Sequence, residues 1–312
     1  MIKKQCKGVC LLFVAFLVVA GCNNAADKKD KEAGPLPGNI YLSADESFRP
    51  VLEEQIKVFE SAYPQTRVIA TYKPEAACLK DYFRDTLNSM VIITRGLTER
   101  EDKYMYDSLG YHPSWDKVAT DAVALLVNSK SDDTLYTINR LQQHLTGEAY
   151  RDQPVVFDGL SATSAVRFIS DSIVKGKKFD TSVVKAAKNS RDVIEFIAGN
   201  EKAIGLVGIS WIGNPEDTSQ LNMLKKVKIA YVQCGFCSGQ PFVKPLQESI
   251  GTRRYPLVRG LYYITKENYY GPAASFAAFL KSERGQLIFK RAYLGTVMDF
   301  DIRRVKLNSK QK

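Results

Sequence analysis

The sequence predicts an α/β protein, because strand-like apolar segments alternate with amphipathic helical segments along the chain. The first instance has a strand at residues 40–43, a helix whose apolar face carries Leu52, Ile56 and Phe59, and a second strand at residues 67–72. This alternation favours mainly parallel sheets. The 312 residues are enough for two lobes of ordinary domain size.

The same alternation continues to the C-terminus. Thr98 and Glu101 have the spacing of a capping box, so a helix is expected to begin there. The other expected helices cover residues 76–86, 135–145, 165–174, 183–188, 191–198, 272–281 and 283–293. The other expected strands cover residues 90–94, 118–128, 154–157, 203–208, 226–232 and 255–266.

The N-terminal segment has the pattern of a secretory signal, with a basic start and a short apolar run that ends at small residues. We assign residues 1–21 to this signal. V-A-G-C, which ends at Cys22, looks like a bacterial lipobox, so Cys22 is the expected lipidation site; the alternative is an ordinary signal with a chance cysteine. Residues 22–37 are polar and rich in Pro and Gly, which predicts a flexible tether. The expected location is extracytoplasmic, on the periplasmic side or the cell surface of a bacterial membrane.

Charge and cysteine usage argue against nucleic-acid binding, redox catalysis and a metal site. The net charge is +10, but no block of Lys and Arg with interleaved aromatic residues occurs, so nucleic acid is not an expected partner. In an oxidising compartment Cys234 and Cys237 could close a small disulfide and leave Cys78 buried and free. A redox site is disfavoured because this pair follows a strand and lies in a loop. His112 and His144 lack metal-ligand spacing, so we expect no metal and no cofactor.

Hydroxyl-bearing residues gather where strands lead into helices, at residues 43–47, 94–95 and 161–164. Helix N-termini present unpaired N–H groups and a partial positive charge, so three such corners could together hold an oxyanion. Asp121 interrupts an apolar strand and therefore needs a partner or has a role. The simpler interpretation is that these hydroxyls only cap helices.

The chain resembles the phosphate-binding lipoproteins and periplasmic proteins that serve phosphate ABC transporters. The motifs that carry the resemblance, over residues 39–297, are S-A-D-E-S-F-R-P-V-L-E-E-Q-I-K-V-F-E-S-A-Y-P, I-T-R-G-L-T-E-R-E, V-A-T-D-A-V-A-L-L-V-N, I-A-G-N-E-K-A-I-G-L-V-G, Y-P-L-V-R-G-L-Y and F-A-A-F-L-K-S-E-R-G-Q.

This resemblance implies a two-lobed fold of the type II periplasmic-binding-protein kind, in which each lobe is a central sheet flanked by helices and a cleft lies between the lobes. The expected first lobe comprises residues 38–124 and 250–305, and the second comprises residues 125–249. A basic tail covers residues 306–312. The implied function is non-catalytic capture of inorganic phosphate by a monomer that delivers it to a membrane ABC permease.

Matching the family's motifs residue by residue assigns the ligand contacts. The expected ligand-binding residues are Ser47, Thr94, Asp121, Ser161, Ala162 and Thr163, and the further candidates are Asp45, Glu46, Arg95 and Ser164. The implied role of Asp121 is to accept the proton of phosphate and so reject sulfate. Phe157 stands where the family often has an arginine, so charge compensation falls to Arg95, Arg167, Arg259 or helix dipoles.

The adjacent acids Asp45 and Glu46 leave the identity of the ligand undecided. One of them could cap its helix and point outward, or face the cleft and accept a proton from the ligand. If both face the cleft while ionised, they reject phosphate, and the cleft serves a cationic or neutral solute. The second hypothesis is therefore a surface sensor or binding component of the same fold for another oxyanion or small solute. An enzyme is disfavoured, since neither Ser161 nor Ser164 lies in a G-x-S-x-G elbow.

Overall fold

The first strands form a parallel group, as the sequence predicts. The computed structural model describes residues 37–159 and 163–300. The predicted signal, Cys22, Ser161, Ala162 and the basic tail lie outside the described residues. Strand β1 (Gly38–Asp45) pairs in parallel with β2 (Thr66–Lys73) on one side and with β3 (Asn88–Ile93) on the other.

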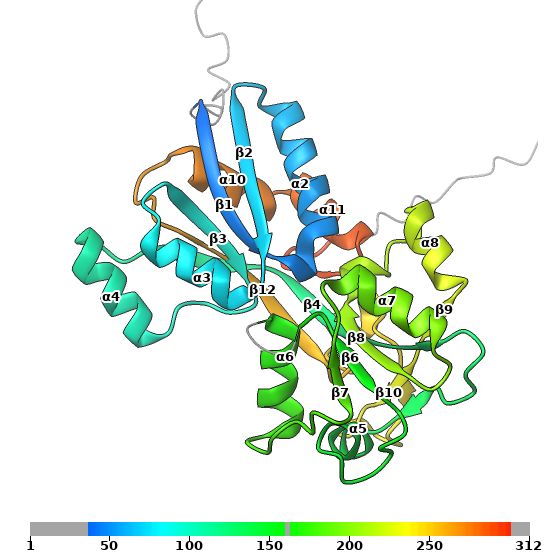
Figure 1. Ribbon diagram of the computed structural model, residues 1–312. Helices are drawn as coiled ribbons and strands as arrows, with labels where there is room; N and C mark the ends of the chain where they lie inside the picture. The colour runs from blue at the N-terminus through cyan, green and yellow to red at the C-terminus, as the bar shows by residue number, and fades with distance from the viewer. Residues whose placement is uncertain (1–36, 160–162, 301–312) are drawn as a thin grey trace, which may run out of the picture. The chain divides into compact units, whose positions relative to one another are not determined.

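Two helices join these strands. Helix α2 (Arg49–Ala62) has a proline in its first turn, where no N–H partner is lost, and it buries Val51, Leu52 and Phe59. Helix α3 (Glu75–Arg84) buries Cys78 and Tyr82. In Figure 1 α2 runs along β1 and β2, while α3 lies beside β3.

The second group of strands is also parallel. It comprises β6 (Val155–Phe157), β7 (Val184–Ala186) and β8 (Ile204–Gly208), with β6 paired to both neighbours. The prediction of a helix over residues 183–188 is therefore wrong. That segment is too short to show a helical period, and Val183 and Val184 are β-branched residues that suit a strand.

Two strands connect the groups. Strand β4 (Ser114–Asn128) pairs antiparallel with β12 (Val258–Thr265), and each also pairs antiparallel with one of the groups: β12 with β3, and β4 with β8. The order of the main sheet is β2-β1-β3-β12-β4-β8-β6-β7. Within this main sheet, parallel pairing is thus confined to the two groups, and the expectation of mainly parallel sheets is wrong at its centre. Figure 1 shows β4 and β12 passing from one group to the other.

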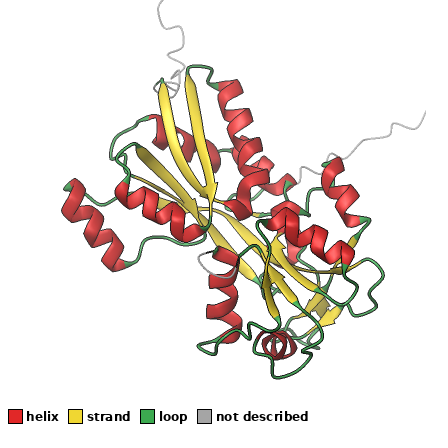
Figure 2. Cartoon of the chain, in the orientation of Figure 1, coloured by secondary structure: helices red, strands yellow, loops and turns green. Residues whose placement is uncertain are grey.

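Helices cover the sheet on both faces (Figure 2). The remaining elements of the main body are α4 (Glu99–Leu109), α5 (Ile138–Leu145), α6 (Ser164–Ile169), the π-helix η2 (Ser170–Val174), α7 (Ser190–Gly199), α8 (Thr218–Leu224), α9 (Gln247–Gly251), α10 (Pro272–Lys281), α11 (Glu283–Arg291), the 3-10 helices η1 (Glu46–Phe48) and η3 (Ile209–Trp211), and the short strands β5 (Leu135–Tyr136), β9 (Val227–Ile229), β10 (Tyr231–Gln233), β11 (Phe242–Val243) and β13 (Gly295–Thr296). The capping box of α4 is present as predicted.

One apolar core runs under both groups of strands. Phe59 of α2 packs against Phe276 and Phe279 of α10, with ring centroids 5.0 and 5.3 Å apart, so the last helices close over the first group. A second, smaller cluster surrounds Cys78 and Tyr82 between α3, β3 and α4. Among residues 37–159 and 163–300, no helix is long and apolar enough to cross a membrane.

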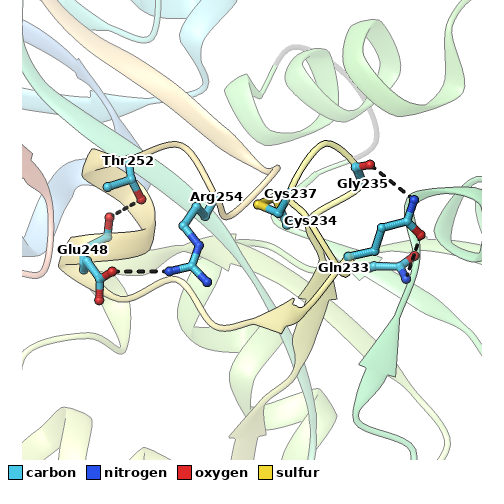
Figure 3. Close-up of a disulfide and its surroundings, with 8 residues drawn as sticks. Gln233, Cys234, Gly235, Cys237, Glu248, Thr252 and Arg254 are labelled. Carbon is cyan, nitrogen blue, oxygen red and sulfur yellow. Dashed lines mark hydrogen bonds and ion pairs between the residues drawn. A yellow bond between two sulfur atoms is a disulfide. The ribbon is translucent and has the colours of Figure 1, made fainter.

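A disulfide closes the loop after β10. Cys234 and Cys237 are joined, and Cys78 is free and buried, which is the arrangement that the sequence left open. Figure 3 shows this loop with Gln233 on one side and the ion pair between Arg254 and Glu248 on the other. Phe236, inside the loop, is 72% exposed, so the bridge holds the loop together without a local core.

Candidate functional site

The carboxyl ends of the two strand groups face each other across the middle of β4. Ile93, the last residue of β3, pairs with Tyr262 of β12, which in turn pairs with Lys117 of β4. Gly208, the last residue of β8, pairs with Val123 of β4 from the opposite direction. The loops that follow both groups therefore meet over residues 118–122. In open α/β sheets ligands bind at such carboxyl ends.

Asp121 and Arg259 form the centre of this site. They are opposite each other on β4 and β12, and Arg259 Nε donates to Asp121 Oδ2 at 2.7 Å. Both side chains are almost fully buried. Arg259 also donates to Ser164 Oγ at 2.8 Å, at the start of α6, and its guanidinium lies 5.2 Å from the centroid of the Phe48 ring. One cation thus joins the connecting strands to the helix corner of the second group.

Gly208 allows this close packing. A Cβ atom at this position would lie 3.2 Å from the carbonyl oxygen of Ser47 and 3.5 Å from Nη2 of Arg259. A side chain there would press against the Ser47 carbonyl oxygen and the Arg259 guanidinium, so a glycine fits where β8 approaches the first loop.

Both acids of the first loop accept hydrogen bonds from groups of the chain itself. Asp45 is 1% exposed and accepts the backbone N–H of Ser47 at 2.8 Å, so it caps η1. Glu46 accepts the hydroxyl of Ser190, at the start of α7, at 2.9 Å. Asp45 therefore points inward and also caps η1, whereas Glu46 is half-buried.

A third acid, Asp158, joins them from the end of β6. Its Oδ2 accepts from Ser47 Oγ at 3.4 Å and from Ser190 Oγ at 3.5 Å. Ser47 Oγ also lies 3.4 Å from Ser164 Oγ. Within the described part of the chain, four buried polar atoms of this site have no hydrogen-bond partner, namely Asp45 Oδ2, Asp121 Oδ1, Asp158 Oδ1 and Arg259 Nη2. Such atoms are costly to bury alone, which makes this group the candidate site for a polar molecule.

Burial raises the pKa values of the acids in this group. Burial raises the pKa of Asp45 to about 6; Arg259 opposes this rise, and Asp158 and Glu75 add to it. Burial also raises the pKa of Glu46 to about 7, against the hydrogen bond from Ser190. The pKa of Asp158 is raised by burial too. The shifts bring the titration of Asp45 and Glu46 close to neutral pH, and a protonated carboxyl group can donate a hydrogen bond as well as accept one.

A separate corner contains Thr94. Its backbone N–H donates to Glu75 Oε2 at 3.0 Å, and its hydroxyl donates to the same oxygen. Arg167 of α6 donates to Glu75 Oε1 through Nε at 2.6 Å and to Thr94 Oγ1 through Nη2 at 2.6 Å. Glu75 and Thr94 are 3% and 6% exposed. In this corner the groups expected to meet a ligand instead surround a carboxylate of the chain itself.

The comparisons identify the family. A family model described as a PBP superfamily domain matches residues 30–284. This chain belongs to the PBP superfamily. The α/β fold of the periplasmic-binding-protein kind, which the resemblance implied, is thus confirmed. No curated protein matches the sequence.

Solved structures share the PBP fold at low sequence identity. A protein described as a phosphate ABC transporter substrate-binding protein with bound phosphate, from Clostridium perfringens, has a TM-score of 0.68 at 20% identity, over 84% of this chain and 100% of that one. An ABC-type phosphate transport receptor from Vibrio cholerae has a TM-score of 0.60 at 16% identity, over 82% and 99%. OxyR from Pseudomonas aeruginosa has a TM-score of 0.53 at 10% identity, over 88% and 80%. The fold therefore does not by itself name a ligand.

The residues predicted from the sequence of this PBP domain fall into three sets. Those that the structure brings together at the centre are Asp45, Glu46, Ser47, Asp121 and Ser164. Thr163 is buried beside them and caps α6 by accepting from the N–H of Val166 at 3.3 Å. Thr94 is engaged by Glu75, and Arg95 pairs with Glu101 at 2.6 and 2.8 Å. Ser161 and Ala162 lie outside the described residues.

Sequence reasoning missed three polar residues of this PBP domain. Asp158 directly follows a predicted strand, so its place at a carboxyl end was a usable signal. Glu75 and Ser190 are the first residues of α3 and α7, where acids and hydroxyls are common as helix-start residues. Only their contacts across the two strand groups distinguish them from ordinary helix starts.

Proposed function

We propose that this protein captures inorganic phosphate for an ABC import permease without performing chemistry. The observation that carries the proposal is the buried polar group at the facing carboxyl ends, in which Asp45 Oδ2, Asp158 Oδ1 and Arg259 Nη2 have no partner among the described residues. Arg259 and the hydroxyls of Ser47 and Ser164 suit an oxyanion. The similarity in fold to a protein with bound phosphate supports this assignment.

The acids determine which form of phosphate the site can take. Asp45, Asp121 and Asp158 face one guanidinium, that of Arg259. Two like charges 4 Å apart repel by about 4 kcal/mol at an effective dielectric constant of 20, so an ionised acid without a shared proton excludes phosphate. Because burial raises the pKa values of Asp45 and Asp158, either acid can hold a shared proton at a smaller cost than an exposed acid. We therefore infer that phosphate binds in a protonated form and shares protons with these acids.

A second candidate function follows from the same excess of acid. If the carboxyl groups stay ionised, the site fits a cationic or neutral solute, and the protein is a surface sensor or binding component of the same fold. Mass spectrometry of the small molecules that co-purify with the protein separates the two candidates. A cationic or neutral solute would favour the second function, and phosphate would favour the first.

Calorimetry with the purified protein tests phosphate capture. We expect binding heat with phosphate and much weaker heat with sulfate, because Asp121 would accept a proton that sulfate lacks. Asp121→Ala should weaken phosphate binding sharply. Asp116→Ala is the matched control, because Asp116 pairs with Lys281 on the exposed surface and should leave affinity unchanged. An absence of heat at millimolar phosphate would rule the function out.

The cellular setting is part of the proposal. We infer that Cys22 carries a lipid and anchors a monomer outside the cytoplasm, where the site can meet the permease. We also infer that residues 38–124 with 250–305 and residues 125–249 act as two lobes, hinged where β4 and β12 connect the strand groups. Replacement of Cys22 by alanine should release the protein from the membrane fraction. If this variant stays membrane-bound, the anchor is elsewhere.

A further inference from the structure

The carboxylate of Glu75 occupies a complete set of oxyanion donors. It receives the backbone N–H of Thr94 at 3.0 Å, the hydroxyl of Thr94, and the guanidinium of Arg167 at 2.6 Å through Nε and 3.3 Å through Nη2. A backbone amide, a hydroxyl and an arginine fork are the groups that bind phosphate and carboxylate alike. Glu75 is 3% exposed, so it holds this position out of water.

These donors come from both strand groups. Thr94 follows β3 of the first group, and Arg167 lies on α6, which begins after β6 of the second group. Figure 1 shows α3 and α6 approaching each other at the middle of the body. Glu75 thus makes inside the chain the kind of bridge that a ligand between the groups would make.

The corner is contiguous with the central site. Ser164, three residues before Arg167 on α6, bonds Arg259, and the charge of Glu75 contributes to the raised pKa of Asp45. Burial alone would raise the pKa of Glu75, but Arg167 and Thr94 lower it below its ordinary value. Glu75 therefore remains ionised near neutral pH, and its negative charge neutralises the positive charge of Arg167. Of Arg167 and Arg259, only Arg259 then compensates the charge of Asp45, Asp121 and Asp158.

We propose that Glu75 is a built-in ligand that competes with phosphate for Thr94 and Arg167. This inference rests on the proposed phosphate function of the same site. Glu75 limits affinity in two ways, because it fills donors that would otherwise hold the anion and because it adds a negative charge beside Asp45. The alternative is a supporting role, in which Glu75 positions Thr94 and Arg167 and its loss weakens binding.

Replacement of Glu75 separates these roles. Glu75→Ala releases Nε and Nη2 of Arg167 from Glu75 and frees both donor groups of Thr94, while Nη1 of Arg167 keeps its pair with Asp171 at 3.6 Å. Each charge-assisted hydrogen bond that the ligand gains is worth enough to raise phosphate affinity about tenfold or more. Glu75→Gln removes the charge but keeps an acceptor for Thr94, so it should fold well and show a smaller rise.

A double variant checks that the gain passes through Arg167. Glu75→Ala combined with Arg167→Ala should lose most of the rise seen with Glu75→Ala alone. The matched control is Asp133→Ala, because Asp133 also accepts an arginine fork, from Arg140, but lies in a different cluster. This control should leave phosphate affinity unchanged, and thermal melting should show which variants are folded.

Calorimetry with phosphate distinguishes every outcome. A rise in the Glu75 variants that Arg167→Ala reverses supports the built-in ligand. If wild type binds phosphate and folded Glu75→Ala or Glu75→Gln binds equally or more weakly, this inference is overturned while the phosphate function stands. If only the Glu75 variants bind, the inference stands and the function proposed for wild type fails. If neither wild type nor any folded variant binds, both are overturned.

Discussion

Replacing Arg259 with glutamine removes the cation at the centre of the acidic site. Arg259 is 5% exposed, donates to Asp121 at 2.7 Å and faces Asp45 and Asp158. Breaking a buried ion pair by removing one partner typically costs about 3–5 kcal/mol, because the other charge stays buried without compensation. Since three acids lose this cation, we expect Arg259→Gln to lower the free energy of unfolding by about 3–5 kcal/mol at pH 7.5.

The loss should depend on pH in a defined direction. Arg259 holds the pKa values of Asp45 and Asp158 below what burial alone would give, so both values rise further without it. A carboxyl group whose pKa is raised in the folded state destabilises the fold above its unfolded pKa, and this penalty fades as pH falls through the folded pKa. The cost of Arg259→Gln should therefore be largest above pH 7 and shrink towards pH 5.

Urea denaturation at several pH values measures this cost. Lys281→Gln is the control, because it breaks the exposed pair with Asp116 and should cost under about 1 kcal/mol. The reasoning would be refuted by an Arg259→Gln variant that loses less than about 1 kcal/mol at pH 7.5. A loss that is equal at pH 5 and pH 7.5 would also refute it, since the acids would then carry no uncompensated charge.

Three further predictions concern protonation and the disulfide. Phosphate affinity should rise as pH falls from 8 to 5.5, because the pKa values of Asp45 and Glu46 are about 6 and about 7. Calorimetry at several pH values should show a flatter dependence of affinity on pH for Asp45→Asn than for wild type. Identical dependences would contradict this prediction. Burial and the nearby positive charge of Arg140 lower the pKa of His144 to about 4. The free energy of unfolding should therefore fall by up to about 3 kcal/mol as pH falls from 6.5 towards 4, because the unfolded chain binds a proton that the folded chain does not. In urea titrations, His144→Phe should lose less stability over this pH range than wild type. Replacing Cys234 and Cys237 with serine should lower the free energy of unfolding by about 2 kcal/mol, as expected for a very short closed loop, and an unchanged denaturation midpoint would exclude a stabilising role.

Local patterns predicted most of the elements. The capping box of Thr98 and Glu101, the helical face of α2 and the long strand β4 are all present where the sequence indicated them. These features depend on neighbours within a few residues, so a single sequence contains the signal. The prediction failed at residues 183–188, because a six-residue segment is too short to distinguish helical from strand periodicity when its pairing partner β6 lies elsewhere in the chain.

The site was only partly predictable. Asp121 was identified because a charged residue inside an apolar strand needs a partner, but Arg259, one of four sources of positive charge considered, is 138 positions away along the chain. Asp158 and Glu75 escaped notice since each looks like an ordinary residue at the end of a strand or the start of a helix. Their place in the site depends on distant contacts. Asp158 contacts Ser47, 111 positions away, and Glu75 contacts Arg167, 92 positions away.

The amino-acid sequence by itself determined the α/β class, the strand and helix corners rich in hydroxyls, and the acid Asp121 within an apolar strand, because propensity and periodicity act over short stretches of chain. The tertiary structure alone decided that Asp45 points inward while Glu46 bonds Ser190, that Arg259 is the cation Asp45 shares with Asp121 and Asp158, and that Glu75 fills the corner of Thr94. The physical reason is that charges act through space, so their partners and their protonation are set only when the strand groups bring distant residues within a few ångströms of one another.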